Sequence, residues 1–421
     1  MTKTDPARPG ARVRGRAGFR RLLVSLGIAG GGLSAMYTGV GTILLPLQIE
    51  HIDRAHKIAA LGVVAGVSAV FALIFNPVGG ALSDRTRSRF GRRAPWLVSA
   101  SAGVFALLGL LGQASTVLLV LVAWCLAQAV ANTYQAPLTA VVPDRVAPAR
   151  RGAASSVAGV ASVLGGVAGV GLASQFSGHL SLGYLVLGVV LVLSAWYFVL
   201  TTTDPPTDGL ARPPRDTRAW GARLGTFVSA LRHRDFACVF ASRAAAILGY
   251  FLVISYELYI LTDYIRLPHG MKPAQGVTVL AAISAVGAIL AAAVAGPISD
   301  RLDRRKPFVI LSSAIAGAGC ILPVISPTFG TIEIFAALAG LAFGCYLSVD
   351  AALVTLVLPR SEDAARDLGV LNIANAGPQV IAPLFAALII SHLGGYRTLF
   401  IAGGCCGIIG ALAVMGVRSV R

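Results

Sequence analysis

The chain contains twelve long apolar runs, each long enough to cross a membrane. A helix needs about 20 apolar residues to span a hydrocarbon core of roughly 30 Å. Hydrophobic residues make up 56% of the 421 positions and charged residues only 13%, a composition that excludes a water-soluble globule. We therefore predict an integral membrane protein with twelve transmembrane helices. The runs occupy residues 21–48, 58–82, 96–113, 115–142, 153–175, 181–202, 236–262, 276–298, 307–326, 331–358, 368–391 and 396–417.

The basic residues gather on one side of the predicted membrane. Of the 35 Lys and Arg residues, 29 fall in the termini and in alternate loops, 5 fall in the loops on the other side, and Arg243 lies within a span. This asymmetry is the positive-inside rule and predicts a multi-pass protein of the plasma membrane with cytoplasmic termini. Lysine supplies only 4 of the 35, which indicates a bacterial, GC-rich source. Because topology accounts for the net charge of +17, we expect no nucleic-acid partner.

Two stretches between neighbouring spans repeat each other. GALSDRTRSRFGRRAPWL at 80–97 matches GPISDRLDRRKPFV at 296–309, and Asp84 and Asp300 are 216 residues apart. The simplest account is two six-helix halves in the same orientation. We expect a cytoplasmic tail over 1–20, a six-helix bundle over 21–202, a linker over 203–235 with a surface helix near 217–233, and a second six-helix bundle over 236–421.

Motifs for catalysis or cofactor binding are missing from the sequence. It contains no HExxH, P-loop or nucleophile-elbow pattern, and its six cysteines lie in predicted spans without metal-ligand spacing. We expect no enzymatic activity, no cofactor and no metal site. The expected partners are the lipid bilayer, a small-molecule solute and protons, with the chain functional as a monomer.

The repeated loops resemble the signature of the major facilitator superfamily, and the longer copy, DRTRSRFGRR, is similar to the glycoside-pentoside-hexuronide and sucrose symporter branches. The resemblance implies an all-α membrane protein whose twelve transmembrane helices form two pseudo-symmetric bundles. It also implies secondary active transport by alternating access. The residues that match and that we assign to gating are Asp84, Arg85, Arg92, Arg93, Asp300, Arg301, Arg304 and Arg305.

The aspartates of these loops suggest a latch between the halves. An Asp at the end of one helix can accept hydrogen bonds from the free N–H groups that begin another helix, and the helix dipole favours that anion. Asp84 would meet the helix start at 368–369, and Asp300 would meet the start at 151–152. The resemblance implies that such contacts hold the cytoplasmic side shut in the outward-open state. The alternative is that the arginines only fix topology.

Polar side chains within the spans are candidates for solute binding. Gln128, Asn132, Gln135 and Thr139 lie on one helical face, and we expect them to line the central cavity that the resemblance implies. Hydrogen bonding between neighbouring helices is the alternative. The other candidate binding residues are Thr38, Tyr250, Asn372 and Asn375.

Charged side chains within the spans are candidates for ion coupling. Arg243, Tyr250 and Glu257 recur at steps of seven, which keeps them on one side of a continuous helix. Arg243 and Asp350 lie at matched depths, roughly 10 to 12 Å from the cytoplasmic end of their helices, so we predict that they form an ion pair. Glu257 lies near the outer end of its span, where we expect water to reach it. A carboxyl that alternately gains and loses water can take and release a proton, so we expect Asp350 or Glu257 to couple transport to protons.

Three functions compete at this point. The first is a proton-coupled (alternatively sodium-coupled) symporter for a neutral polar solute such as a sugar or glycoside, favoured by the branch resemblance and the amide-rich face. The second is a proton-coupled exporter of drugs or metabolites. The third is a receptor or scaffold that retains the fold, although the chain keeps its latch carboxylates and has no large soluble domain. We favour the first.

Overall fold

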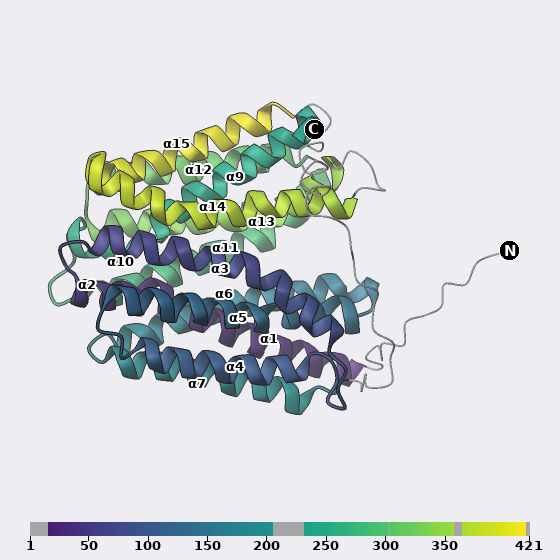
Figure 1. Cartoon of the computed structure of the whole chain (residues 1–421). Coiled ribbons are helices and arrows are strands. Elements are labelled where there is room, and N and C mark those ends of the chain that lie inside the picture. The colour runs from purple at the N-terminus through teal and green to yellow at the C-terminus, as the bar shows by residue number, and fades with distance from the viewer. Residues whose placement is uncertain (1–15, 205–230, 303, 358–363, 418–421) are drawn as a thin grey trace.

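The computed structural model of the protein describes residues 16–204, 231–302, 304–357 and 364–417. Within these residues it contains twelve helical spans of sufficient length and apolar character to cross a membrane, as the sequence predicts. They run roughly parallel in one bundle, with α1 to α7 on one side and α9 to α15 on the other (Figure 1). The predicted surface helix near 217–233 lies outside the described residues.

The first half contains six spans. The first of them passes from α1 through a π-helical turn into α2. The elements are α1 (Arg16–Gly39), η1 (Val40–Leu44), α2 (Leu45–Ile52), α3 (Lys57–Arg85), α4 (Ala94–Leu111), α5 (Val117–Arg145), η2 (Pro148–Arg150), α6 (Arg151–Gln175) and α7 (Leu180–Thr201).

The second half repeats the order of the first. Its elements are α9 (Arg234–Ile254), α10 (Glu257–Asp263), α11 (Pro273–Leu302), α12 (Lys306–Ile325), α13 (Phe329–Val357), α14 (Ala364–His392) and α15 (Gly395–Met415). The repeat extends to single contacts. The Ser83 hydroxyl donates to the Arg92 carbonyl at 3.2 Å, and the Ser299 hydroxyl donates to the Arg304 carbonyl at 3.4 Å. The motif therefore builds the same loop twice.

One predicted helix is broken in the structure. The sequence predicts a single span over 236–262, whereas α9 ends at Ile254 and α10 begins at Glu257. The Ser255 hydroxyl donates to the Phe251 carbonyl at 2.6 Å, and such a side-chain bond competes with the helical ladder and bends it. The expected face shared by Arg243, Tyr250 and Glu257 is therefore wrong as a feature of one continuous helix.

Glycines let two pairs of helices approach closely. Lipid provides no hydrophobic driving force between apolar helix surfaces, so close backbone packing has to hold the helices together. In the first half, a Cβ at Gly165 or Gly169 of α6 would collide with the backbone of α1 at Gly31 or Ala35. In the second half, Gly340 and Gly344 of α13 lie in the same way against the backbone of α11. The two halves thus place their tightest helix pair at different positions in the repeat.

The halves meet at the end of the bundle that lies opposite the described chain ends. The early part of α3 packs there on the late part of α14, where a Cβ at Gly62 or Gly66 would contact Ala387 or Leu384. Nearby, the late part of α6 lies against the early part of α11. At the other end, the start of α6 is exposed, and nothing stands within 4 Å of a Cβ placed at Gly152. Within the described residues, these contacts hold the halves together at the end opposite the termini.

We predict that Gly169→Leu destabilises the protein by on the order of 3 kcal/mol, because the added side chain forces α1 and α6 apart. Gly159→Leu is the matched control, since Gly159 lies on the same helix with open space around it. The measurement is the temperature at which each detergent-purified variant leaves the monodisperse peak in size-exclusion chromatography. Equal temperatures for the two variants would contradict the proposed packing.

Candidate solute-binding site and gates

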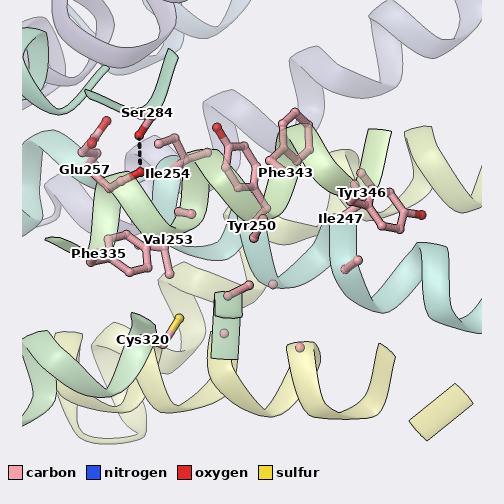
Figure 2. A pocket seen from close by; sticks show the side chains of 18 of the residues that line it. Ile247, Tyr250, Val253, Ile254, Glu257, Ser284, Cys320, Phe335, Phe343 and Tyr346 are labelled. Atoms are coloured by element: carbon pink, nitrogen blue, oxygen red, sulfur yellow. Dashed lines mark hydrogen bonds between the residues drawn. The ribbon is translucent and has the colours of Figure 1, made fainter. Parts of the chain in front are cut away.

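A cavity lies inside the second half, walled by α9 to α13 and α15 (Figure 2). Tyr250 and Phe343 stack within it, with ring centroids 4.4 Å apart and ring planes inclined by 11°. Phe335, Val253 and Cys320 contribute further apolar surface. The cavity has a volume of about 70 Å³.

Glu257 lines this cavity and is the charged group on its wall. The residue is only 9% exposed, so the sequence-based expectation that water solvates it is wrong in this conformation. Glu257 is the first residue of α10, and the four residues that follow it are also buried. Its carboxyl makes no hydrogen bond or ion pair with the part of the chain that the structure describes. A buried carboxylate without a partner costs several kcal/mol, so this group favours the protonated form or a ligand.

The predicted amide face on α5 is partly engaged. Asn132 is buried, its amide donates to the Tyr37 hydroxyl at 3.2 Å, and it accepts a hydrogen bond from Asn76 at 3.2 Å. It thus joins α1, α3 and α5. Gln128 and Gln135 are half-buried and Thr139 is exposed. Asn132 therefore fixes the helices, whereas the two glutamines have accessible surface.

The other candidate binding residues are dispersed. Thr38 donates to the Gly166 carbonyl at 2.8 Å and so joins α1 to α6. Asn375 is half-buried on α14. Arg243 lies two turns before Tyr250 on α9 and does not line the cavity of Tyr250 and Glu257. The side chains of Asn372 and Asp350 lie outside the described part of the structure, so the Arg243–Asp350 pair stays a prediction.

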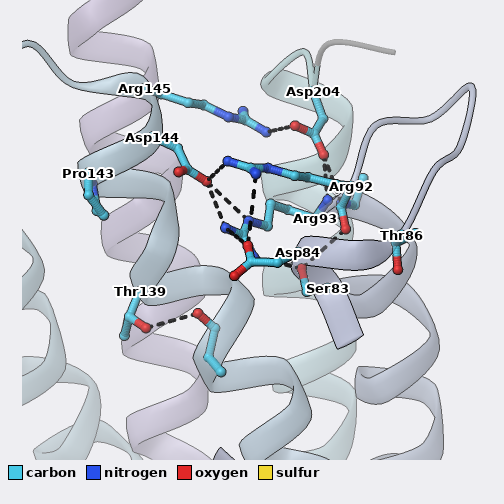
Figure 3. Close-up of polar contacts among 12 residues, drawn as sticks. Ser83, Asp84, Thr86, Arg92, Arg93, Thr139, Pro143, Asp144, Arg145 and Asp204 are labelled. Atoms are coloured by element: carbon cyan, nitrogen blue, oxygen red, sulfur yellow. Dashed lines mark hydrogen bonds and ion pairs between the residues drawn. The ribbon is translucent and has the colours of Figure 1, made fainter. Parts of the chain in front are cut away.

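An ion-pair network occupies the end of the first half that holds the chain start (Figure 3). Arg93 is 3% exposed, and its guanidinium lies 2.8 Å from an Asp84 oxygen and 2.9 Å from an Asp144 oxygen. Arg92 also reaches Asp144 at 2.7 Å. A charge that is buried to this extent requires such partners.

Asp204 attaches the end of α7 to the same network. One of its oxygens accepts from the Arg93 backbone N–H at 2.7 Å, and the other pairs with Arg145 at 2.6 Å. Gly91 makes room for it, because Gly91 has a φ of +84° and a Cβ there would collide with the Asp204 carboxylate. Asp144, Arg145 and Asp204 were missed in the sequence. They could have been found from the sequence because Asp144 and Asp204 are isolated acids in loops on the basic side of the predicted membrane.

Asp84, one of the two predicted latch carboxylates, does not contact the other half in this conformation. Asp84 pairs with Arg92 and Arg93 of its own half and keeps 52% of its side chain exposed. Arg85, Arg301 and Arg304 are exposed. The side chains of Asp300 and of residues 364–369 lie outside the described set. The latch therefore stays a prediction for the opposite conformation.

A different ion pair closes the opposite end. The Lys57 ammonium, at the start of α3, lies 2.8 Å from Glu50 of its own half and 2.9 Å from Asp263 of the other half. The Tyr396 hydroxyl donates to the second Asp263 oxygen at 2.7 Å. The ammonium also stands 4.7 Å from the centroid of the Tyr259 ring, a cation–π distance. Lys57 is 8% exposed, so this gate is nearly dry.

Two tyrosines beside Glu257 extend that closure. The Tyr256 hydroxyl donates to the Ile58 carbonyl at 2.9 Å, and the Tyr259 hydroxyl donates to the Pro46 carbonyl at 2.8 Å. Both acceptors belong to the first half. Residues of the cavity wall and of the closed gate therefore alternate at the start of α10, where Glu257 lies between Tyr256 and Tyr259.

Sequence comparison gives a family match over most of the chain. A family model described as MFS/sugar transport protein matches residues 26–362. None of the curated protein sequences is similar to the chain.

Solved structures share the fold at low sequence identity. A bacterial homologue of the human lysosomal transporter Spinster, inward-facing and unoccupied, has a TM-score of 0.74 at 15% identity and covers 97% of this chain and 98% of its own. The peptide transporter POT in complex with sulfate has a TM-score of 0.75 at 14% identity and covers 96% of both chains. The nucleoside transporter NupG has a TM-score of 0.73 at 13% identity and covers 94% of this chain and 99% of its own. At these identities the likeness concerns the fold alone.

We predict that Arg93→Ala lowers the free energy of unfolding by about 2 kcal/mol, because it leaves the carboxylates of Asp84 and Asp144 without their shared partner. Arg85→Ala removes the same charge at an exposed position and should change stability by less than about 0.5 kcal/mol. Thermal unfolding of the two purified variants tests this difference. Equal losses would mean that the network contributes nothing beyond net charge.

We predict that cysteines at Gly171 and Thr278 form a disulfide across the closed gate. A Cβ at Gly171 would stand 3.6 Å from the Thr278 methyl group, and the two positions belong to different halves. In a variant whose six native cysteines are replaced, mild oxidation should cross-link this pair, and Lys57→Met should slow the reaction severalfold by weakening the gate.

The control pair is Gly159→Cys with Thr278→Cys, because Gly159 has open space around it. Electrophoresis after cleavage of the 205–230 segment would separate linked from unlinked halves. Failure of the Gly171 pair to link at any oxidant concentration would contradict the observed closure.

Proposed function

The chain belongs to the MFS/sugar transport protein family of the major facilitator superfamily, and we propose that it is a proton-coupled symporter of a neutral polar solute such as a sugar or glycoside. Membership makes it a secondary transporter, and such carriers expose one central site alternately to the two sides of the membrane. Beyond this membership, we propose the coupling ion, the direction of transport and the class of solute.

The observation that carries the proposal is the burial of Glu257 without a polar partner among the described residues. Energetics favour a neutral, protonated carboxyl in that position. The adjoining Tyr256 and Tyr259 hold the gate shut. Proton binding at Glu257 would therefore lower the cost of the closed arrangement, and proton loss would favour a rearrangement of α10 that admits water. This linkage between proton and gate is what a symporter requires.

The cycle that follows uses both ends of the molecule. With the termini in the cytoplasm, as the charge asymmetry predicts, the present conformation faces inward and the Lys57–Asp263 gate faces outward. Release of solute and proton to the cytoplasm would precede opening of that gate. In the outward-facing state, we propose that Asp84 and Asp300, with the arginines beside them, close the cytoplasmic end at the starts of α14 and α6.

Solute recognition would use groups on both halves. Gln128 and Gln135 offer half-buried amides on α5, and Asn375 offers another on α14. Amides are suited to sugar hydroxyls because each carries both donors and acceptors. Tyr250 and its stacked partner Phe343 would provide an apolar face on the other side of the site.

A proton-coupled exporter of drugs or metabolites is the second candidate. The observation that favours it is the apolar wall of the cavity, which would suit a hydrophobic solute better than a free sugar. Glu257 could attract a cationic drug in the same position. The family match and the amide groups on α5 favour the symporter, and the transport assay below separates the two.

We predict that Glu257→Gln abolishes solute-driven proton uptake into proteoliposomes while retaining solute exchange at equal concentrations on both sides. A glutamine keeps the size and hydrogen-bonding capacity of the neutral acid but cannot carry a proton. The readout is an internal pH dye together with radiolabelled solute, tested over a panel of sugars, glycosides and cationic drugs.

Glu333→Gln is the matched control, because Glu333 is a half-buried acid on the same half, outside the cavity. Asp350→Asn tests the other carboxylate that the sequence proposes for coupling. Intact proton movement in the Glu257 variant, together with its loss in the Asp350 variant, would transfer the coupling role to Asp350. Proton movement driven only by cationic drugs would establish the exporter.

A further inference from the structure

We propose that the transported solute carries an apolar ring or short chain that binds inside the second half, so that the natural substrate is a glycoside with an aryl or alkyl aglycone. This inference rests on the proposed function and names its substrate class. It starts from the location of the cavity, whose lining residues all belong to the second six-helix bundle.

Small residues on facing helices create the space. Ala246 on α9, Ala316 on α12, Ala339 on α13 and Gly407 on α15 all face the cavity. Larger side chains at these positions would fill the interior of the bundle in the way that protein cores are normally filled. An interior left open at several helices at once is costly unless a ligand occupies it during the working cycle.

The wall offers little to a free sugar. The Ser284 hydroxyl already donates to the Ala336 carbonyl at 2.9 Å, and the Ser312 hydroxyl donates to the Val309 carbonyl at 2.9 Å. Ser313 Oγ lacks a partner within the described structure, and the other polar groups on the wall are the Glu257 carboxyl and the hydroxyls of Tyr250 and Tyr346. A sugar hydroxyl buried without a partner is destabilising. These few groups cannot provide partners for all the hydroxyls of a hexose, so a free hexose is disfavoured in the depth of the cavity.

The same wall suits an aromatic or aliphatic group. Tyr250 and Phe343 present a stacked pair of rings, and Phe335 lines another part of the cavity beside Val253 (Figure 2). An apolar group of the solute gains dispersion and hydrophobic free energy against such surfaces, and an aromatic ring gains more by stacking. The sugar end would remain between the halves, within reach of the amides of Gln128 and Gln135.

Glu257 ties this site to the gate. It lines the cavity, and its neighbours Tyr256 and Tyr259 make the contacts that close the far end. An apolar group that enters the cavity would exclude the remaining water from Glu257 and so favour its neutral form. Binding of the aglycone and binding of the proton would therefore support each other, which is the reciprocity that coupled transport demands.

The experiment compares methyl and p-nitrophenyl glycosides of glucose and of galactose in proteoliposomes, with internal acidification as the readout. We expect a p-nitrophenyl glycoside to reach half-maximal rate at about a tenfold lower concentration than its methyl counterpart, because it buries an additional ring. Ala316→Leu, which fills the cavity, should remove this difference. Ala314→Leu, on the exposed face of α12, should retain it.

The outcomes separate the two proposals. Equal half-maximal concentrations for both glycosides, unchanged by Ala316→Leu, would overturn the aglycone site and leave the symporter intact. The absence of internal acidification with every sugar and glycoside would overturn the symporter as well. Ala339→Leu fills the same cavity from α13 and replaces Ala316→Leu if that variant does not purify as a monodisperse protein.

Discussion

An ionised side chain within a membrane is stable only where a partner or water compensates its charge, and this constraint organises the whole molecule. At the end that holds the termini, Arg93 is buried because three acids surround it directly or through its backbone. At the opposite end, Lys57 is buried because Glu50 and Asp263 share it. Glu257 lines the cavity and makes no such pair within the described residues. This contrast is the reason that we propose Glu257 as the proton-coupling group.

Each end stabilises a buried cation with acids, but only the Lys57 site joins the two halves. The Arg93 network lies within the first half and anchors α7 to the loop after α3 through Asp204, so it can persist when the halves move. The Lys57 contact to Asp263 joins the two halves and has to break when the far end opens. Lys57 keeps Glu50 as a partner after that separation. The paired arrangement therefore reduces the electrostatic cost of opening, since the ammonium is not left alone.

The sequence was sufficient for the twelve spans and the two halves, because hydropathy and the 216-residue repeat are local signals that lipid enforces directly. It was not sufficient for the break after Ile254, because the apolar run continues past it and the Ser255 hydroxyl bond to Phe251 is a local bond that a continuous helix also permits. The burial of Glu257 was missed for that reason, and its role in coupling stays a prediction. The Asp204 anchor was missed because it depends on a positive φ at Gly91.

The cavity shows why pseudo-symmetry does not make the halves equivalent. In the first half, the glycines of α6 bring it onto α1, the span that begins the bundle. In the second half, the close approach of this kind is between α13 and α11. The counterpart of α1 is α9, which instead packs on α15, where a Cβ at Gly249 would stand 2.9 Å from the Cys406 Cβ and from the Gly403 carbonyl oxygen. The α9 helix ends at Ile254, and its residues Tyr250 and Val253 line the internal cavity. The repeat therefore sets the order of the helices, whereas the positions of a few glycines decide which helices pack most closely.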